Sequence, residues 1–110
     1  MKKTKRARLE ARGWRVGSAA DFLNLTPEEA AFVETKLALS MTLRQRRISQ
    51  HVTQHLLAKR LRSSQSRVAK MEAGDASVSV DLLLRALFAL GAKPRDIGNV
   101  LQRHKRQAAA

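Results

Sequence analysis

The chain has 110 residues, a length that supports one domain with a single hydrophobic core. It carries 22 lysine and arginine residues against 9 aspartate and glutamate residues, a formal net charge of +13. Such a charge attracts polyanions, either nucleic acid or an anionic membrane surface. No apolar run approaches the ~20 residues of a membrane-spanning helix, and the basic N-terminus lacks the apolar region of a secretion signal, so we expect no membrane partner. The lack of cysteine excludes disulfides and thiolate metal sites and fits a reducing cytoplasm, where we expect the protein to act.

The composition predicts an all-α fold, because helix formers dominate and no alternating strand pattern is present. Residues 1–17 hold seven basic residues against the single acidic Glu10. This segment is expected to be a solvated tail, and the alternative is a basic N-terminal arm that contacts phosphates or enters the minor groove of DNA. A short extra helix over residues 19–23, capped by Ser18, is expected to follow.

The sequence Thr26-Pro27-Glu28-Glu29 predicts the start of a long helix. Thr26 is expected to cap it, Pro27 suits its first position, and Glu29 completes a capping box. No helix breaker follows before about Arg47. The helix has two apolar sides, Ala30, Val33, Leu37 and Met41 on one and Phe32, Leu39 and Leu43 on nearly the opposite one. One side is expected to pack on the rest of the domain, which leaves the other for the N-terminal segment or a second subunit.

Four shorter helices are predicted after the long one, at residues 53–61, 64–72, 79–90 and from 94 to about 101. Thr53, Ser64 and Ser79 are plausible N-caps, and Gly74 and Gly91 follow the ends of two helices. The folded domain is therefore expected over residues 18–101. From Gln102 to residue 110 we expect a frayed tail.

The helix expected at 64–72 has the pattern of a recognition helix. Val68 and Met71 mark its buried side, and polar or basic residues lie on the opposite side. Glutamine can bond adenine through two hydrogen bonds, and arginine or lysine can bond the guanine edge. The alternative is an ordinary solvent-exposed polar face, but the caps, the tight turn before the helix and the net charge together favour DNA readout.

Residues 43–90 resemble the xenobiotic-response-element family of helix-turn-helix proteins, which has the lambda-repressor-like fold. The matching pieces are Leu43-Arg44-Gln45-Arg46-Arg47, Val52-Thr53-Gln54, Leu57-Ala58-Lys59-Arg60-Leu61, Ser64-Gln65-Ser66-Arg67-Val68, Met71-Glu72-Ala73-Gly74, Ser77-Val78-Ser79 and Leu83-Leu84-Arg85-Ala86-Leu87. With the long preceding helix, the chain is similar to HigA-like antitoxins of that family over about residues 18–101. The resemblance implies a domain of about five helices.

The resemblance also implies roles for residues at matching positions. Base reading is implied for Gln65, Ser66, Arg67 and Lys70. Arg67 alternatively contacts a phosphate. Gln54 would bond a phosphate and brace the recognition helix, and the further phosphate contacts would be Ser64, Arg44, Arg46, Lys59, Arg60 and Arg62. Arg47 and Glu72 match a pair that forms an internal salt bridge. A dimer or partner surface is expected at Ala30, Val33, Leu37, Met41 and Phe88.

Several positions depart from the family pattern. Arg62 stands where the turn usually has glycine, a site that favours positive φ, at a cost of about 1 kcal/mol for other residues. Either the turn has a different geometry or a phosphate contact compensates. His51 also replaces a common glycine, and Ser63 replaces an apolar turn residue. Leu56 and Phe88 occupy positions that are usually exposed, and large apolar groups there favour an interface.

We expect no enzyme and no cofactor, since the sequence has no phosphate loop, nucleophile elbow or credible carboxylate pair. His51 and His55 are four residues apart, but they lack further ligands for a metal. The expected function is a sequence-specific transcriptional regulator, a repressor that binds an inverted repeat in double-stranded DNA as a homodimer. The alternatives are an antitoxin that sequesters a protein toxin and represses its own operon, and a nonspecific polyanion or RNA binder. Scarce aromatic residues disfavour single-stranded RNA.

Overall fold

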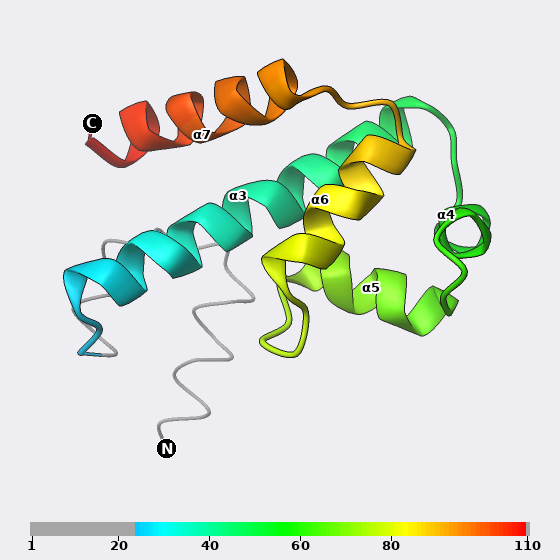
Figure 1. The fold of residues 1–110 in the computed structure, drawn as a ribbon, viewed down its shortest axis with the longest axis horizontal. Coiled ribbons are helices and arrows are strands. Elements are labelled where there is room, and N and C mark those ends of the chain that lie inside the picture. Colours follow the sequence, from blue (N-terminus) through cyan, green and yellow to red (C-terminus); the bar gives the residue numbers. More distant parts are fainter. Residues whose placement is uncertain (1–23, 110) are drawn as a thin grey trace.

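The computed structural model describes residues 24–109, with side chains as far as Arg103. This part of the chain forms five helices and no strand: α3 (Pro27–Ser49), α4 (Gln54–Arg60), α5 (Gln65–Ala73), α6 (Val80–Ala89) and α7 (Pro94–Ala109) (Figure 1). The predicted all-α fold is confirmed. The expected basic arm at 1–17 and the short helix at 19–23 lie outside the described residues.

The predicted capping box starts α3. The Glu29 amide donates to Thr26 Oγ1 at 3.1 Å, and the Thr26 amide donates to a Glu29 carboxylate oxygen at 2.9 Å. These hydrogen bonds favour the ionised carboxylate, so the backbone and side chain of Thr26 lower the pKa of Glu29. The Thr26 hydroxyl and the Glu29 carboxylate thereby accept hydrogen bonds from amides that the start of a helix leaves without partners.

The other N-caps were also predicted correctly. The hydroxyls of Thr53, Ser64 and Ser79 accept hydrogen bonds from the amides at the third positions of α4, α5 and α6. Gly74 ends α5 in the left-handed conformation, with φ of 71°. Three residues with short hydroxyl side chains and one glycine therefore divide this stretch into separate helices.

The end of the chain differs from the prediction. A frayed tail was expected from Gln102, but the backbone of α7 is helical as far as Ala109. The reason is that residues 102–109 contain no glycine or proline, and glutamine, arginine, lysine and alanine all have favourable helix propensities. The end of the folded core was thus mistaken for the end of the helix.

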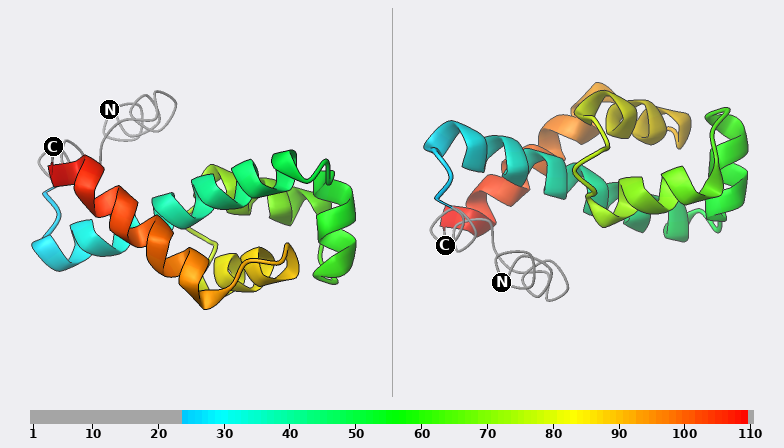
Figure 2. Two further views of the ribbon diagram at one scale, coloured as in Figure 1. Left: turned by 90° about the horizontal axis from the view of Figure 1, so that it is seen from above. Right: turned by 90° about the horizontal axis from the view of Figure 1, so that it is seen from below.

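The long helix α3 runs through the middle of the fold. In Figure 1, α5 and α6 lie on one side of α3 and α7 lies on the other, while α4 closes one end. The views in Figure 2 show α7 crossing over α3. Helix α3 therefore acts as a scaffold on which the α4–α5 hairpin is held in place.

The hydrophobic core is built around α3, α4, α5 and α6. Its fully buried side chains are Leu39, Leu43, Leu57, Val68, Met71, Leu83 and Leu87. Ile97 and Leu101 of α7 pack against this cluster from outside. Burial of one such leucine contributes about 1.5–3 kcal/mol to the free energy of unfolding. The inward residues of these helices together therefore hold α5 in a fixed orientation.

Of the two apolar sides predicted for α3, the side with Leu39 and Leu43 faces the core. Phe32 was predicted on that side, but it is 56% exposed, because it lies near the start of α3, away from the buried cluster. On the other side, Met41 is 58% exposed. The side of α3 that carries Met41 is thus covered only in part by the described residues.

Candidate nucleic-acid interface

Helix α5 presents its predicted base-reading side chains to solvent. Gln65, Ser66, Arg67 and Lys70 are all exposed, while Val68 and Met71 on the opposite side are fully buried. The Ser64 hydroxyl accepts from the Arg67 amide at 3.2 Å, which fixes the first turn of the helix. Ser66, Arg67 and Lys70 line one hollow beside α5, and Gln65 lies at the N-terminal end of the helix, where it contacts Gln54.

A chain of polar contacts leads from the interior of the fold to Gln65. Arg47 of α3 donates to both carboxylate oxygens of Glu72, with 3.0 Å between Nη2 and Oε1, and its Nη1 donates to the Val52 carbonyl at 2.9 Å. Gln54 Nε2 donates to Glu72 Oε1 at 3.1 Å. Gln65 Nε2 in turn donates to Gln54 Oε1 at 2.9 Å. We refer to Arg47, Glu72, Gln54 and Gln65 as the bracing network.

The ion pair at the base of the bracing network is largely removed from water. The side chains of Arg47 and Glu72 are 12% and 3% exposed, and the hydrogen bonds to Glu72 raise the pKa of Arg47. A bidentate pair in such surroundings has a fixed geometry. The predicted internal salt bridge thus joins α3 to the end of α5.

The bracing network leaves Gln65 equipped for base recognition. Its bond to Gln54 uses one amide hydrogen, so Oε1 and the second amide hydrogen stay available. One acceptor and one donor in the plane of an amide are what adenine requires in the major groove. The family resemblance implied that Gln54 braces the recognition helix, and in the structure Gln54 contacts α5 at both Gln65 and Glu72.

The turn between α4 and α5 keeps the geometry that usually requires glycine. Arg62 has φ of 54°, and the Ser63 amide donates to the Ala58 carbonyl at 2.8 Å. His51 also has a positive φ, of 58°. A different turn geometry, one of the two alternatives for Arg62, is therefore excluded. The other alternative is a compensating phosphate contact, and the Arg62 side chain is exposed, as such a contact requires.

A hollow of about 270 Å³ lies beside the exposed side of α5. It is lined by Ser64, Ser66, Arg67, Lys70, Ser77 and Val78. Ser77, which sequence reasoning missed as part of this surface, comes from the α5–α6 loop. Its amide and hydroxyl donate to Asp75 Oδ1 at 2.8 and 2.6 Å, and these bonds are the main cause of a lowered Asp75 pKa, with smaller effects from Lys70 and Lys36. The Asp-x-Ser spacing of Asp75 and Ser77 is typical of a turn closed by a side chain, and it is the sequence signal that could have indicated the structure of this loop.

The predicted phosphate contacts divide into two groups. Arg44, Lys59, Arg60 and Arg62 are exposed, and Ser64 and Gln54 lie at the starts of α5 and α4. Arg46 is different, because its Nε donates to the Leu90 carbonyl at 3.3 Å and its Nη2 lies 4.0 Å from Asp96. The structure therefore does not bring Arg46 together with the residues around α5.

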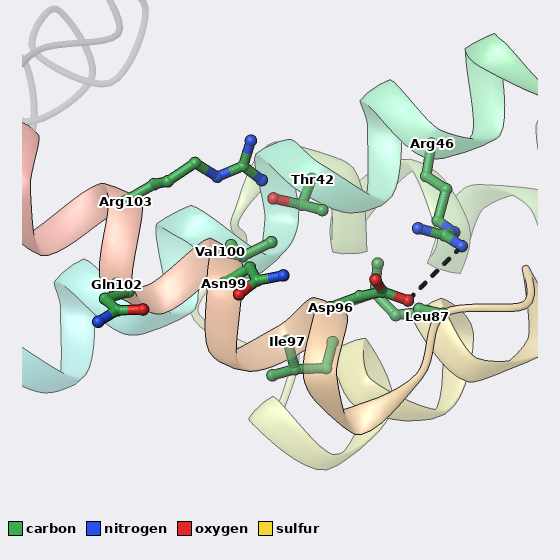
Figure 3. A pocket seen from close by; sticks show the side chains of 10 residues that line it. Thr42, Arg46, Leu87, Asp96, Ile97, Asn99, Val100, Gln102 and Arg103 are labelled. Atoms are coloured by element: carbon green, nitrogen blue, oxygen red, sulfur yellow. Dashed lines mark ion pairs between the residues drawn. The ribbon is translucent and has the colours of Figure 1, made fainter.

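Arg46 instead lines a cleft of about 420 Å³ between α3, α6 and α7. Figure 3 shows Arg46 and Asp96 pointing toward each other across this cleft, with Thr42 between Arg46 and Arg103. Gln50 also donates to the Leu90 carbonyl, at 2.7 Å. These contacts tie the end of α3 to the corner between α6 and α7.

The residues predicted to form a dimer or partner surface lie in two places. Ala30, Val33 and Leu37 are partly buried on α3, and Met41 of the same helix is exposed. Leu37 packs against the end of α5, since a Cβ at Gly74 would lie 3.0 Å from Leu37 Cδ2. Phe88, on α6, is 46% exposed, as is Leu56 of α4 at 41%. His51 and His55 are exposed, and residues 24–103 contain no group of three or more side chains placed to hold a metal.

Comparison with protein-family models gives a match to a helix-turn-helix domain over residues 38–99, more than half of the chain. The chain belongs to this helix-turn-helix family. The match covers α4 and α5, which are the two helices of the motif, together with the second half of α3, all of α6 and the start of α7. Comparisons with curated proteins and with solved structures gave no match.

Family membership supports DNA binding by this domain, and α5 stands in the position of the second helix of the helix-turn-helix. Among the helices of residues 24–109, none is both long enough and apolar enough to cross a membrane. Residues 27–37 of α3 and residues 100–109 of α7 extend beyond the matched residues.

Proposed function

We propose that this helix-turn-helix protein is a transcriptional repressor of the xenobiotic-response-element type, which binds an inverted repeat in duplex DNA as a homodimer. The observation that carries the proposal is the bracing network, which runs from the buried Arg47–Glu72 pair to the exposed Gln65. A polar side chain held in one orientation loses little conformational freedom when it bonds a base. Such a device is useful for reading sequence and has no value for nonspecific attraction.

The charge distribution supports duplex DNA as the ligand. The exposed Lys59 and Arg60 of α4 and Arg62 of the turn lie close to α5 in sequence, and the whole chain has a net charge of +13. Phosphate contacts of this kind give affinity that falls steeply with salt concentration. The proposed activity is binding, without catalysis.

The experiment that tests the proposal is selection of binding sites from a random duplex pool at physiological salt, with the bound sequences read out. We expect enrichment of a two-fold repeat whose half-sites have centres about 10 base pairs, or 34 Å, apart. If no sequence is enriched, and if affinity is the same for all duplexes, the protein is a nonspecific polyanion binder and the proposal is wrong.

A second candidate function is that of an antitoxin, which sequesters a protein toxin and represses its own operon. The observation that favours it is the exposure of Phe32 (56%) on the part of α3 that precedes the family match. A large exposed aromatic side chain on an added segment is typical of a protein interface. The test is whether the chain binds and neutralises the product of a small neighbouring reading frame. No binding to that product would eliminate this candidate.

A further inference from the structure

A row of buried residues runs along the side of α3 that contacts α5. We call Lys36, Ser40, Leu43 and Arg47 the inner row, because at 100° per residue these four positions fall within an arc of about 60°. The side chain of Arg47 is 12% exposed, and the other three residues are at most 9% exposed. Arg47 bonds Glu72 near the end of α5. Lys36 lies at the opposite end of the inner row, about 16.5 Å from Arg47 along the axis of α3.

The burial of Lys36 requires a partner for its amine, because lysine is almost never fully buried unless it is paired. Lys36 Nζ donates to the Ala76 carbonyl at 3.3 Å, between residues that are 40 positions apart in the sequence. Ala76 belongs to the α5–α6 loop, residues 74–79. Among residues 24–103, this is the one hydrogen bond that ties residues 75–77 to α3. Lys36 therefore connects the loop to the scaffold helix.

The α5–α6 loop has an internal structure that does not fix its position relative to α3. Asp75 Oδ1 accepts from the amide and the hydroxyl of Ser77, and the Val78 amide donates to the Asp75 carbonyl at 3.1 Å. Val78 is buried in the core and anchors the loop where it enters α6. Residues 75, 76 and 77 are exposed. The bond from Lys36 consequently holds the exposed part of the loop in place.

The exposed part of the loop forms one wall of the hollow beside α5. Ser77 and Val78 line the hollow on the side of the loop. On the side of α5 it is lined by three of the residues predicted to read bases, which are Ser66, Arg67 and Lys70. The Arg47–Glu72 pair holds α5, so a shift of the loop would change the width of the hollow without moving the helix. Two residues of the inner row thus hold the two walls of the hollow, Arg47 through α5 and Lys36 through the loop.

We propose that Lys36 is a positioning residue of the DNA-binding surface, whose bond to the Ala76 carbonyl holds the α5–α6 loop at the distance from α5 that bound DNA requires. This inference rests on the proposed function, and it adds to the binding surface a residue that precedes the family match at 38–99. Because Lys36 is 9% exposed, it acts through the loop and not by contact with a phosphate.

The variant that tests this role is Lys36→Met. Methionine is unbranched like lysine, and the substitution removes the donor without leaving a buried charge. Ala76 is exposed, so water can replace the lost donor, and we expect unfolding in urea close to that of the wild type. Ser40→Ala is the matched control, since Ser40 lies one turn along the inner row. Ser40 is 1% exposed, and its hydroxyl has no hydrogen-bond partner among the described residues.

The first measurement is made on the free protein. Backbone amide relaxation by NMR gives the order parameters of residues 75–77, which should fall from about 0.85 in the wild type to below about 0.6 in Lys36→Met. The order parameters of α5 should stay at the rigid value in both variants. Ser40→Ala should match the wild type throughout, because it leaves the bond from Lys36 to the loop intact.

The second measurement is the affinity for the operator obtained by site selection. We expect Lys36→Met to weaken binding about tenfold, the size of one lost hydrogen bond. The slope of log affinity against log salt should be unchanged, since no phosphate contact is removed. Ser77→Ala alters the same wall, so adding it to Lys36→Met should weaken binding little further. Arg44→Ala, at a separate site, should multiply with Lys36→Met.

Several results would overturn the proposal. Unchanged order parameters in Lys36→Met would show that the amine does not hold the loop, and a looser loop with full operator affinity would show that DNA does not depend on its position. Losses that multiply for Lys36→Met and Ser77→Ala would place the effect outside this wall. A salt slope lowered by about one would make Lys36 a phosphate contact. An equal loss in Ser40→Ala would reduce the role of Lys36 to packing.

Failure of this proposal is distinguishable from failure of the proposed function. If site selection enriches no sequence, the repressor function fails, while the order parameters still decide whether Lys36 holds the loop. If an operator is selected and Lys36→Met binds it like the wild type, the positioning role fails and the repressor function remains.

Discussion

Arg46 and Arg47 are neighbours in the sequence, yet they serve different regions of the molecule. Arg47 points toward α5, where its bidentate pair with Glu72 is 12% and 3% exposed. Arg46 points toward the corner between α6 and α7, where it lies 4.0 Å from Asp96 with 30% and 40% exposure. Successive residues on a helix point about 100° apart, so two identical side chains reach different neighbours.

Burial, and not residue type, is expected to decide how much each of these two ion pairs contributes to the free energy of unfolding. A buried charge that loses its partner retains a large desolvation cost, while a half-exposed charge is hydrated by water instead. The α3–α5 junction should therefore be sensitive to single substitutions, and the α3–α7 corner should be tolerant of them. In this protein the sensitive junction is also the one that supports the recognition helix.

The largest effect is expected from Glu72→Ala. This substitution leaves the buried Arg47 without its counter-charge and Gln54 without its acceptor, so we predict that the free energy of unfolding falls by about 3–5 kcal/mol. Equilibrium unfolding in urea measures this change in the free energy of unfolding. The double replacement Arg47→Met with Glu72→Leu removes both charges and should cost less than Glu72→Ala alone. A loss below about 1 kcal/mol for Glu72→Ala would mean that the junction is no more sensitive than the corner.

A smaller effect of opposite sign is expected from Arg62→Gly. The backbone at Arg62 has φ of 54°, so glycine should raise the free energy of unfolding by up to about 1 kcal/mol. His51→Gly is the matched control, since φ there is 58°. Both variants should be stabilised, but only Arg62→Gly should weaken DNA binding, and equally for all sequences. Equal DNA affinity for the two variants would remove Arg62 from the phosphate contacts.

The smallest effect is expected at the corner. A double-mutant cycle of Arg46→Ala and Asp96→Ala should give a coupling energy of about 0.5 kcal/mol or less, because the pair is half exposed and its atoms are 4.0 Å apart. Unfolding in urea at two salt concentrations measures this coupling. Base preference should be unchanged in Arg46→Ala. A coupling energy similar to that of Arg47 and Glu72 would contradict the distinction drawn between the two regions.

Local signals in the sequence were sufficient to predict the helices and the polar side of α5. The capping box at Thr26 and Glu29, the hydroxyl caps and Gly74 are short-range features, and each was found where it was expected. From the resemblance to a family with glycine in that turn, a positive φ at Arg62 was one of two alternatives, and it is the one that the structure has. The Arg47–Glu72 pair was likewise identified from that resemblance, and the structure shows its burial.

Contacts between distant segments were harder to predict. The direction of Arg46 depends on where the corner at Leu90 lies, which a local pattern does not reveal. The continuation of α7 beyond Leu101 was missed because the apolar pattern ends there, although helix propensity does not. Ser77 was missed because its place beside α5 results from the path of the α5–α6 loop.

Gln65, held by the bracing network, is the side chain that we propose reads a base. The most direct measurement is the base-preference profile of Gln65→Ala beside those of the wild type and Arg44→Ala, obtained by site selection at one salt concentration. We predict that Gln65→Ala loses preference at one position of each half-site, worth about 1–3 kcal/mol, and that Arg44→Ala binds all sequences more weakly with an unchanged profile. A Gln65→Ala profile identical to that of the wild type would contradict the assignment of α5 as the helix that reads the sequence.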